Sequence, residues 1–248
     1  MILVIADDLS GAAELAGIAA SHGYSAEVHT DFDPTSRVDV VAVDSRTRSL
    51  TPEPAAAHVA KIIRTAINPD WIYKKTDSVL RGNIRAELES MMKATGKQRA
   101  LFIPANPGKA RCILNGNYYV NQVPLHETVF ASDPDHPQTT SDVIEALGPG
   151  ALFIHSIRRD ESLPEEGIIV PDVESGTDIL KRASEVDDGT FTAGAAEFFT
   201  ALLNGRTISE RLPGHAALPA GVTSNRWKAR STWKRSRFRK LAATSRRS

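Results

Sequence analysis

Short apolar runs alternate with longer amphipathic segments along most of the chain. Residues 2–6 form a continuous apolar run, which is typical of a strand buried on both faces. Apolar residues at helical spacing follow as far as Ser21 and predict a helix. The alternation recurs, with strands expected near 25–29, 38–43, 71–74, 100–103, 151–154 and 168–171, and helices over 51–67, 84–95, 141–147 (capped by Ser141), 177–186 and 194–203. Strands alternating with helices predict an α/β fold with a doubly wound, mostly parallel sheet.

A β-hairpin insertion is expected to interrupt this alternation near residues 110–121. The pair Asn115-Gly116 is a strong signal for a tight hairpin turn, because both residues adopt the left-handed backbone conformations that such turns require. The pair lies between the segments Cys-Ile-Leu and Tyr-Tyr-Val, which have the apolar and aromatic composition of strands.

The periodic pattern ends near residue 205, where the composition also changes. Residues 211–248 hold 11 of the 30 basic residues and none of the 30 acidic ones, so the rest of the chain has a formal charge of −11. We therefore expect an α/β domain over 1–205 and a basic, disordered or aberrant tail over 206–248, as a frameshifted reading or a degenerate remnant would give. Trp227 and Trp233 offer stacking surfaces for bases among these cations. The acidic domain would repel nucleic acid, however, so the sequence argues against such a partner.

The composition excludes several classes of protein. The 248 residues contain no apolar run near the roughly 20 needed to span a bilayer, so no membrane partner is expected. The single cysteine, Cys112, permits no internal disulfide, and the first residues do not resemble a signal peptide, which favours a cytoplasmic location. The seven histidines lack the spacing of a zinc site, so no metal site is predicted, and neither glycine-rich phosphate-loop motif is present.

Polar residues follow three of the predicted strands and precede the next helices. They are Asp7, Asp8, Ser10, Asp44, Ser45, Arg46, Lys75, Thr76, Asp77, Ser78, Arg81, Gly82 and Asn83. Because the carboxyl ends of parallel strands meet at one edge of a sheet, we expect these side chains to lie close together. Taken singly, each acid or hydroxyl is better explained as a helix cap, but capping requires neither Arg46 nor Lys75.

This set of side chains suits a small, polar, anionic ligand. Guanidinium groups such as Arg46 and Arg81 can bind a carboxylate through two hydrogen bonds, and carboxylates accept hydrogen bonds from sugar hydroxyls. An acid beside such a hydroxyl can take its proton during phosphoryl transfer, and Lys75 would offset the developing charge. Asp8 and Asp77 are both candidates for this base, and their spacing does not choose between them.

The chain resembles the N-terminal, sugar-binding domain of the four-carbon acid sugar kinases. The resemblance rests on residues 5–11, 44–46, 73–83 and 116–134, of which the string Lys-Thr-Asp-Ser-Val-Leu-Arg-Gly-Asn is the most specific, and it covers residues 1 to about 203. It implies ATP-dependent phosphorylation of threonate, erythronate or an oxo relative, with Mg²⁺ arriving with the nucleotide. On this basis we expect Asp8 and Asp77 to be catalytic and the substrate to be bound by Asp7, Ser10, Arg46, Lys75, Ser78, Arg81, Gly82 and Asn83.

Members of that family continue into a second domain that carries most of the ATP contacts. In this sequence the basic tail stands where that domain would begin, so the chain is expected to be the substrate-binding half, able to bind a sugar acid without turnover. The expected partner is a small-molecule sugar acid, and a homo-oligomer is compatible with the sequence.

Two alternatives have different functions on a similar fold. In a phospho-acceptor receiver module, Asp7 and Asp8 would be the acid pair and Asp44 the acceptor. The chain is much longer than such a module needs, and the basic residues after Asp44 crowd the acceptor position. The second alternative is a sugar-acid-binding domain that catalyses nothing.

Overall fold

A computed structural model describes residues 1–206, and residues 207–248, which contain the predicted basic tail, lie outside the described part of the chain. An eight-stranded sheet with every neighbouring pair parallel forms its centre, in the order β2-β3-β1-β4-β11-β5-β10-β9. The strands are β1 (Ile2–Ala6), β2 (Ala26–His29), β3 (Val40–Asp44), β4 (Trp71–Lys75), β5 (Arg99–Ile103), β9 (Ile154–Ile157), β10 (Gly167–Pro171) and β11 (Thr190–Gly194). The predicted doubly wound, mostly parallel sheet is therefore confirmed.

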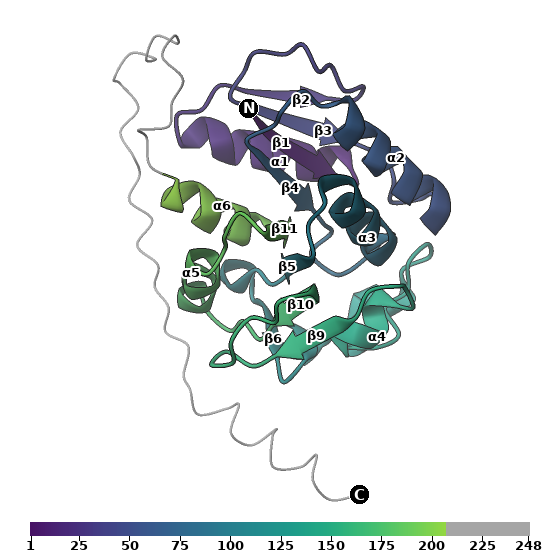
Figure 1. Ribbon diagram of the computed structural model, residues 1–248. Helices are drawn as coiled ribbons and strands as arrows, with labels where there is room; N and C mark the ends of the chain where they lie inside the picture. The colour runs from purple at the N-terminus through teal and green to yellow at the C-terminus, as the bar shows by residue number, and fades with distance from the viewer. Residues whose placement is uncertain (207–248) are drawn as a thin grey trace, which may run out of the picture. The chain divides into compact units, whose positions relative to one another are not determined.

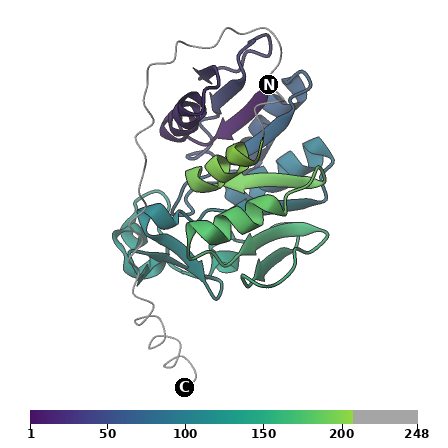
Figure 2. The same cartoon turned by 90° about the vertical axis from the view of Figure 1, so that its left-hand side faces the viewer.

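Helices cover both faces of this sheet, as Figures 1 and 2 show. One face carries α1 (Leu9–Ser21), α5 (Gly176–Ser184) and α6 (Ala196–Gly205), and the other carries α2 (Pro52–Thr65) and α3 (Ile84–Thr95). β1, β3, β10 and β11 are buried at every position, because helices pack on both of their faces. None of the helices described here is long and apolar enough to cross a bilayer.

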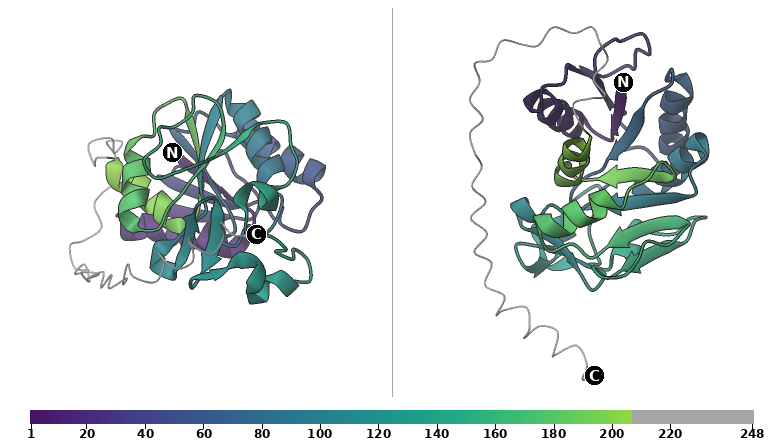
Figure 3. Two further views of the ribbon diagram at one scale, coloured as in Figure 1. Left: turned by 90° about the horizontal axis from the view of Figure 1, so that it is seen from below. Right: turned by 60° about the vertical axis from the view of Figure 1, so that its left-hand side comes forward.

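The predicted hairpin insertion is present and belongs to a second, smaller antiparallel sheet, shown in teal in Figure 3. Its strands are β6 (Arg111–Leu114), β7 (Asn117–Val120) and β8 (Val123–Pro124). The carboxylate of Asp172, just after β10, accepts hydrogen bonds of 2.9 Å from the amides of Asn115 and Gly116 at the turn. Ile113 also exchanges two backbone hydrogen bonds of 2.9 Å with Val173. These bonds fix the hairpin against the end of the main sheet.

The helical segments on either side of the hairpin are short. η1 (Pro107–Lys109) comes before it, and η2 (Leu125–Glu127), η3 (Val129–Ser132) and α4 (Val143–Leu147) come after it. The N-cap of α4 is Asp142, whose side chain accepts from the amides of Ile144 and Glu145, and not the predicted Ser141. Ser141 instead accepts a hydrogen bond from the amide of His126. β9 begins at Ile154, where the predicted strand was expected to end.

The sequence pattern failed to predict β11, although β11 lies between β4 and β5 in the middle of the sheet. Its sequence, Thr-Phe-Thr-Ala-Gly, contains two hydroxyl residues and ends in glycine, so it is not an apolar run. Thr192 accepts a hydrogen bond of 2.8 Å from the indole of Trp71, which satisfies a polar group in the core. Gly194 has φ of +148°, and a β-carbon there would lie 2.0 Å from the carbonyl oxygen of Ile103. Only glycine permits this close approach to β5.

Candidate functional site

The ends of three adjacent strands bring the predicted site residues to one edge of the sheet. In the parallel register, Ala6 at the end of β1 pairs with Asp44 at the end of β3 and with Lys75 at the end of β4. The helices that follow β1 and β4 lie on opposite faces of the sheet (Figure 1). Loops that part in this way leave a crevice at the carboxyl ends of the strands, where ligands bind in open α/β sheets.

The side chain of Arg48 contacts residues from the loops after β1 and β4. The sequence analysis did not predict Arg48 as a site residue. Its guanidinium lies 2.7 Å from Asp7 Oδ2, 2.8 Å from Asp8 Oδ2 and 3.7 Å from Asp77 Oδ2. Only 20% of the Arg48 side chain is exposed, so these ion pairs are shielded from water. Burial lowers the pKa of Arg48, but the hydrogen bond and charge of Asp7 and the charges of Asp77 and Asp8 outweigh it and raise the pKa. The guanidinium therefore stays charged and holds three carboxylates together.

Arg81, a predicted site residue, extends this cluster to a second segment. Its Nε lies 3.1 Å from Asp77 Oδ1 and its Nη2 2.9 Å from Asp77 Oδ2, and Nη1 reaches Asp133 Oδ2 at 3.1 Å. Asp133 belongs to the loop after η3, and its other oxygen accepts hydrogen bonds from the amides of Asp135 and His136. The ring of His136 contacts the carbonyl oxygen of Arg48 at 2.9 Å. The segment 133–136 thus packs over the cluster and completes it.

The electrostatics keep Asp77 ionised. Burial of the Asp77 carboxyl raises its pKa, but the hydrogen bonds and charge of Arg81, together with the charge of Arg48, outweigh burial and hold the pKa below the usual value. Amide hydrogen bonds from His136 and the guanidinium of Arg81 also lower the pKa of Asp133. The four carboxylates of Asp7, Asp8, Asp77 and Asp133 surround only two guanidiniums, so the cluster carries a net negative charge. Such a cluster is better suited to bind the hydroxyl groups of a ligand, which donate hydrogen bonds, than a carboxylate of the ligand, which only accepts them.

Arg46 does not join this group, in contrast to the expected substrate-binding arrangement. Its backbone has φ of +53°, which turns the side chain out of the loop. The guanidinium instead contacts the carbonyl oxygen of Thr30 at 3.2 Å and Asp31 Oδ1 at 3.3 Å, and the side chain is 63% exposed. Arg48, two residues further on, is the arginine of this loop that faces the carboxylates of the strand ends.

Several other predicted residues hold the loops in place through bonds within the chain. The side-chain amide of Asn83 donates to the carbonyl oxygens of Thr47 (3.0 Å) and Leu50 (2.7 Å), which fixes the loop that carries Arg48. Gly82 has φ of +90°, and a β-carbon there would lie 3.4 Å from Asp7 Oδ2 and 3.5 Å from Arg48. Asp8 caps α1 by accepting a hydrogen bond of 2.7 Å from the amide of Gly11, and its other oxygen forms the ion pair with Arg48.

The remaining predicted residues lie around the cluster. The ammonium of Lys75 donates to the carbonyl oxygen of Thr76 at 2.9 Å and lies 3.5 Å from Glu14 Oε2. Ser10 is exposed in the first turn of α1. Ser78 accepts a hydrogen bond from Arg111, the first residue of the hairpin. Asp44, the acceptor in the receiver alternative, is only 5% exposed and accepts from the amide of Arg46, so it is not presented to a phosphodonor.

A buried ion pair behind the strand ends supports the Arg48 loop. Lys74 Nζ lies 2.9 Å from Glu87 Oε2, and the two side chains are 0% and 1% exposed. The other carboxylate oxygen of Glu87 accepts a hydrogen bond from the hydroxyl of Thr47, which lies 2.8 Å from the hydroxyl of Ser45. Ser45 in turn donates to the carbonyl oxygen of Ala6 at 2.7 Å. This chain of contacts links β4, α3 and β1 through the loop that positions Arg48.

Tyr118 connects the hairpin to the strand ends. Its hydroxyl, buried on β7, lies 2.6 Å from the carbonyl oxygen of Ser78 and 3.0 Å from that of Pro104. Burial raises the pKa of Tyr118 far above its usual value, so the hydroxyl remains a donor at any physiological pH.

We expect Tyr118→Phe to reduce the free energy of unfolding by about 1–3 kcal/mol, because two buried carbonyls lose their shared donor. Urea unfolding followed by circular dichroism measures this change. Tyr119→Phe is the matched control, since Tyr119 is half-buried on the same strand, and a change within about 0.5 kcal/mol is expected for it. Equal stability of the two variants would show that the Tyr118 hydroxyl does not secure the hairpin.

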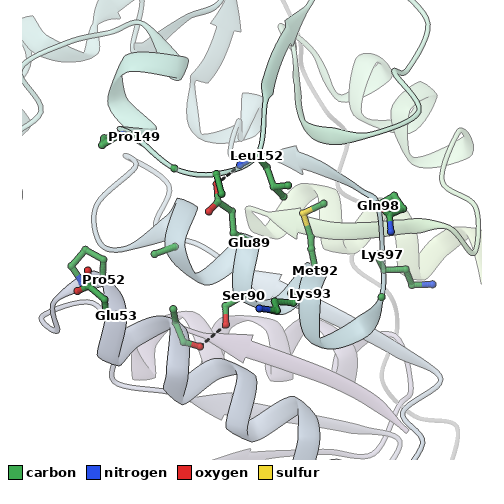
Figure 4. Close-up of a pocket in the computed structure, with 15 residues that line it drawn as sticks. Pro52, Glu53, Glu89, Ser90, Met92, Lys93, Lys97, Gln98, Pro149 and Leu152 are labelled. Atoms are coloured by element: carbon green, nitrogen blue, oxygen red, sulfur yellow. Dashed lines mark hydrogen bonds between the residues drawn. The ribbon is translucent and has the colours of Figure 1, made fainter.

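A hollow of 740 Å³ lies between α2, α3 and the segment 149–152, away from the strand ends, and Figure 4 shows the residues that line it. Two of its polar side chains bond within the chain: Glu89 accepts a 2.9 Å hydrogen bond from the amide of Leu152, and Ser90 donates to the carbonyl oxygen of Ala56 at 2.7 Å. The Arg48 cluster does not line it. We therefore place the candidate site at the carboxyl ends of β1, β3 and β4.

Within residues 1–206, no group of three histidine, cysteine or carboxylate side chains is arranged to hold a metal ion. The carboxylates at the strand ends are paired with Arg48 and Arg81. The chain also lacks the glycine-rich sequences that cradle phosphates.

The fold and the cluster define an α/β domain that presents carboxylates and arginines at the carboxyl ends of its central strands, the place where open α/β sheets bind ligands. The chain belongs to the family described as the sugar-binding N-terminal domain, whose family model matches residues 2–202. This assignment confirms the resemblance inferred from the sequence.

Relatives of known name include a D-threonate kinase from Salmonella typhimurium, 32% identical over 228 residues, covering 81% of this chain and 53% of the relative. A D-erythronate kinase from Heliobacterium modesticaldum is 31% identical over 156 residues, and this match covers 58% of this chain and 36% of the kinase. A crystal structure of a protein from Bordetella bronchiseptica, a domain-swapped dimer with bound citrate, superposes with a TM-score of 0.70 at 25% identity, over 81% of this chain and 55% of that one. The chain spans about half the length of the first relative.

Proposed function

We propose that residues 1–206 form the sugar-acid-binding part of a kinase that uses ATP to phosphorylate a hydroxyl of threonate, erythronate or an oxo relative. The observation that carries the proposal is the convergence of Asp7, Asp8 and Asp77 on the guanidinium of Arg48 at the sheet edge. The kinases named above are relatives of this chain, and citrate, bound to the Bordetella protein, is itself a hydroxy acid.

The chemistry of the cluster accounts for binding of a sugar hydroxyl. Ionised carboxylates accept hydrogen bonds from hydroxyls, and the arginines fix the carboxylates so that no side-chain freedom is lost when the substrate binds. Asp77 has a lowered pKa and is only 8% exposed, which suits a group that orients a hydroxyl. Asp8 is 30% exposed and makes fewer bonds, so it is the more accessible candidate for the base that receives the hydroxyl proton.

ATP and Mg²⁺ enter this proposal through the relatives. When bound, the nucleotide supplies the phosphoryl group and Mg²⁺ neutralises its charge. The residues described here bind and orient the acceptor, and we assign no nucleotide contact to them. Self-association stays an expectation for this chain, suggested by the dimer of the Bordetella protein.

Isothermal calorimetry of the full 248-residue protein tests the proposal, with D-threonate and D-erythronate as ligands and succinate as the four-carbon acid without hydroxyls. We expect saturable binding of at least one sugar acid and none of succinate, because the carboxylate cluster selects for hydroxyls. An assay of sugar-acid-dependent ATP consumption then separates a kinase from a binding domain that catalyses nothing. Absence of binding to both sugar acids would refute the assignment.

A further inference from the structure

Arg111 differs from the other cations at the carboxyl edge of the sheet. Arg48, Arg81 and Lys75 each lie within 4 Å of at least one carboxylate, and Arg46 pairs with Asp31. Arg111 makes no ion pair with any residue in the range 1–206, and its one side-chain hydrogen bond runs to the hydroxyl of Ser78. It is half-buried, so its charge is poorly compensated by water. An arginine placed in this way is ready to receive an anion.

The position of Arg111 is fixed by its backbone. It opens β6 and exchanges two backbone hydrogen bonds with Asn106, of 2.8 and 3.1 Å. Tyr118 on the paired strand binds the carbonyl oxygen of Ser78, which is the residue that Arg111 contacts. The guanidinium is therefore held beside the residue that follows Asp77, and not on a loose loop.

Unpaired polar atoms lie along the same edge. Asn106 Oδ1, Thr76 Oγ1 and Asp7 Oδ1 are buried and have no hydrogen-bond partner within the described part of the chain. They follow β5, β4 and β1, and each belongs to a residue at most 3% exposed. A buried polar atom without a partner costs free energy that a bound ligand can recover. Asn106 is paired with Arg111 through the backbone, and Thr76 and Asp7 follow other strands of the same edge, so these atoms are a second sign that the edge is built to receive a polar molecule.

We propose that Arg111 binds the carboxylate of the sugar acid, while Asp77 and its neighbours accept hydrogen bonds from the hydroxyls. The inference rests on the function proposed above and names the group that recognises the acid end of the substrate. Arg81 is a weaker choice, because each of its three guanidinium nitrogens already donates a hydrogen bond to Asp77 or Asp133. Arg111 contacts Ser78, the residue after Asp77, so a carboxylate bound at Arg111 would lie beside the segment that carries the Asp77 carboxylate.

Calorimetry of the full-length protein with two probes tests this role: D-threonate, or D-erythronate if it binds more tightly, and the neutral amide of the same acid. Arg111→Met keeps the apolar stem and removes the charge. We expect it to weaken binding of the acid by about 10- to 100-fold, because a charge-assisted hydrogen bond is lost, and to leave binding of the amide unchanged. Arg111→Lys keeps a charge without the planar fork and should give an intermediate loss. Arg64→Met removes an exposed arginine from α2 and serves as the matched control, with unchanged affinity.

Circular dichroism spectra and thermal unfolding of each variant establish that it is folded before its affinity is compared. If the unmodified protein binds neither sugar acid, the proposed function fails and Arg111 is not the reason. If the unmodified protein binds the acid and Arg111→Met binds it equally well, the assignment of Arg111 is wrong. A loss that affects acid and amide to the same extent, or a loss produced by Arg46→Met in its place, would also overturn it.

Discussion

Glu87→Ala is expected to destabilise the protein by about 3–5 kcal/mol, because it leaves the ammonium of Lys74 buried without its counter-ion. Lys74 is 0% exposed, and its nitrogen lies 2.9 Å from Glu87 Oε2, so water cannot replace the lost carboxylate without rearrangement of the core. A domain of ordinary stability has about 5–15 kcal/mol in total, so the variant should be close to unfolding at 37 °C. Urea unfolding at 25 °C measures the loss.

The double variant Lys74→Met with Glu87→Leu distinguishes an unpaired charge from a simple loss of packing. Replacing both members of a buried pair with apolar residues of similar volume is often nearly neutral, so the double variant should be more stable than Glu87→Ala. Glu166→Ala is the surface control, since Glu166 is exposed in the loop before β10, and we expect a change within about 0.5 kcal/mol. A double variant as unstable as the single one would show that the charge was not the cause.

Arg48→Ala should weaken sugar-acid binding at least about 30-fold, the cost of removing one partner from a hydrogen-bonded, buried charge pair. Without this guanidinium, the carboxylates of Asp7, Asp8 and Asp77 repel one another, and proton uptake by one of them becomes favourable. Calorimetry against the sugar acid that the unmodified protein binds gives the change in affinity. Unchanged affinity would show that Arg48 does not organise the site.

The same variant has a defined pH dependence. The pKa of Asp77 is lowered in the folded protein, so its contribution to stability is present above the unfolded value, near 3.8, and is lost as the pH falls below it. Arg48→Ala removes part of this contribution, so the stability difference between the variant and the unmodified protein should be larger at pH 7 than at pH 3. Arg46→Ala, which breaks only an exposed ion pair, should show little difference at either pH. Urea unfolding at the two pH values measures both.

The periodicity of the sequence was sufficient to predict most of the fold, and local chemistry explains where it was not. Helix α3 begins and ends where expected, because Ile84 starts an amphipathic segment and Gly96 stops it in the left-handed conformation. The hairpin was predicted because its turn is encoded by two adjacent residues. β11 was missed because its stability comes from contacts with β4 and β5, which are distant in sequence. Its composition alone gives no signal for a central strand.

The candidate site shows the same division. Asp7, Asp8, Asp77 and Arg81 lie close together because the carboxyl ends of parallel strands meet at one edge of the sheet, as we expected from the sequence. Whether Arg46 or Arg48 faces the carboxylates depends on the left-handed backbone conformation of Arg46 in an irregular loop. The periodicity of the sequence does not predict such a conformation. Asp133 was also missed as a site residue, although its segment carries part of the family resemblance, because it lies 52 positions after Arg81 and reaches it only through tertiary folding.

The place of β11 in the sheet has a consequence for how the domain is made. Thr192 in β11 accepts its hydrogen bond from Trp71, which lies 121 residues earlier in the chain. Without β11, the strands β2-β3-β1-β4 and β5-β10-β9 share no pairing, and the edges of β4 and β5 that face β11 lack their partners. Because β11 is the last strand of this sheet in the sequence, the sheet can be completed only after residues 190–194 have been synthesised, and we expect the domain to fold slowly for its size.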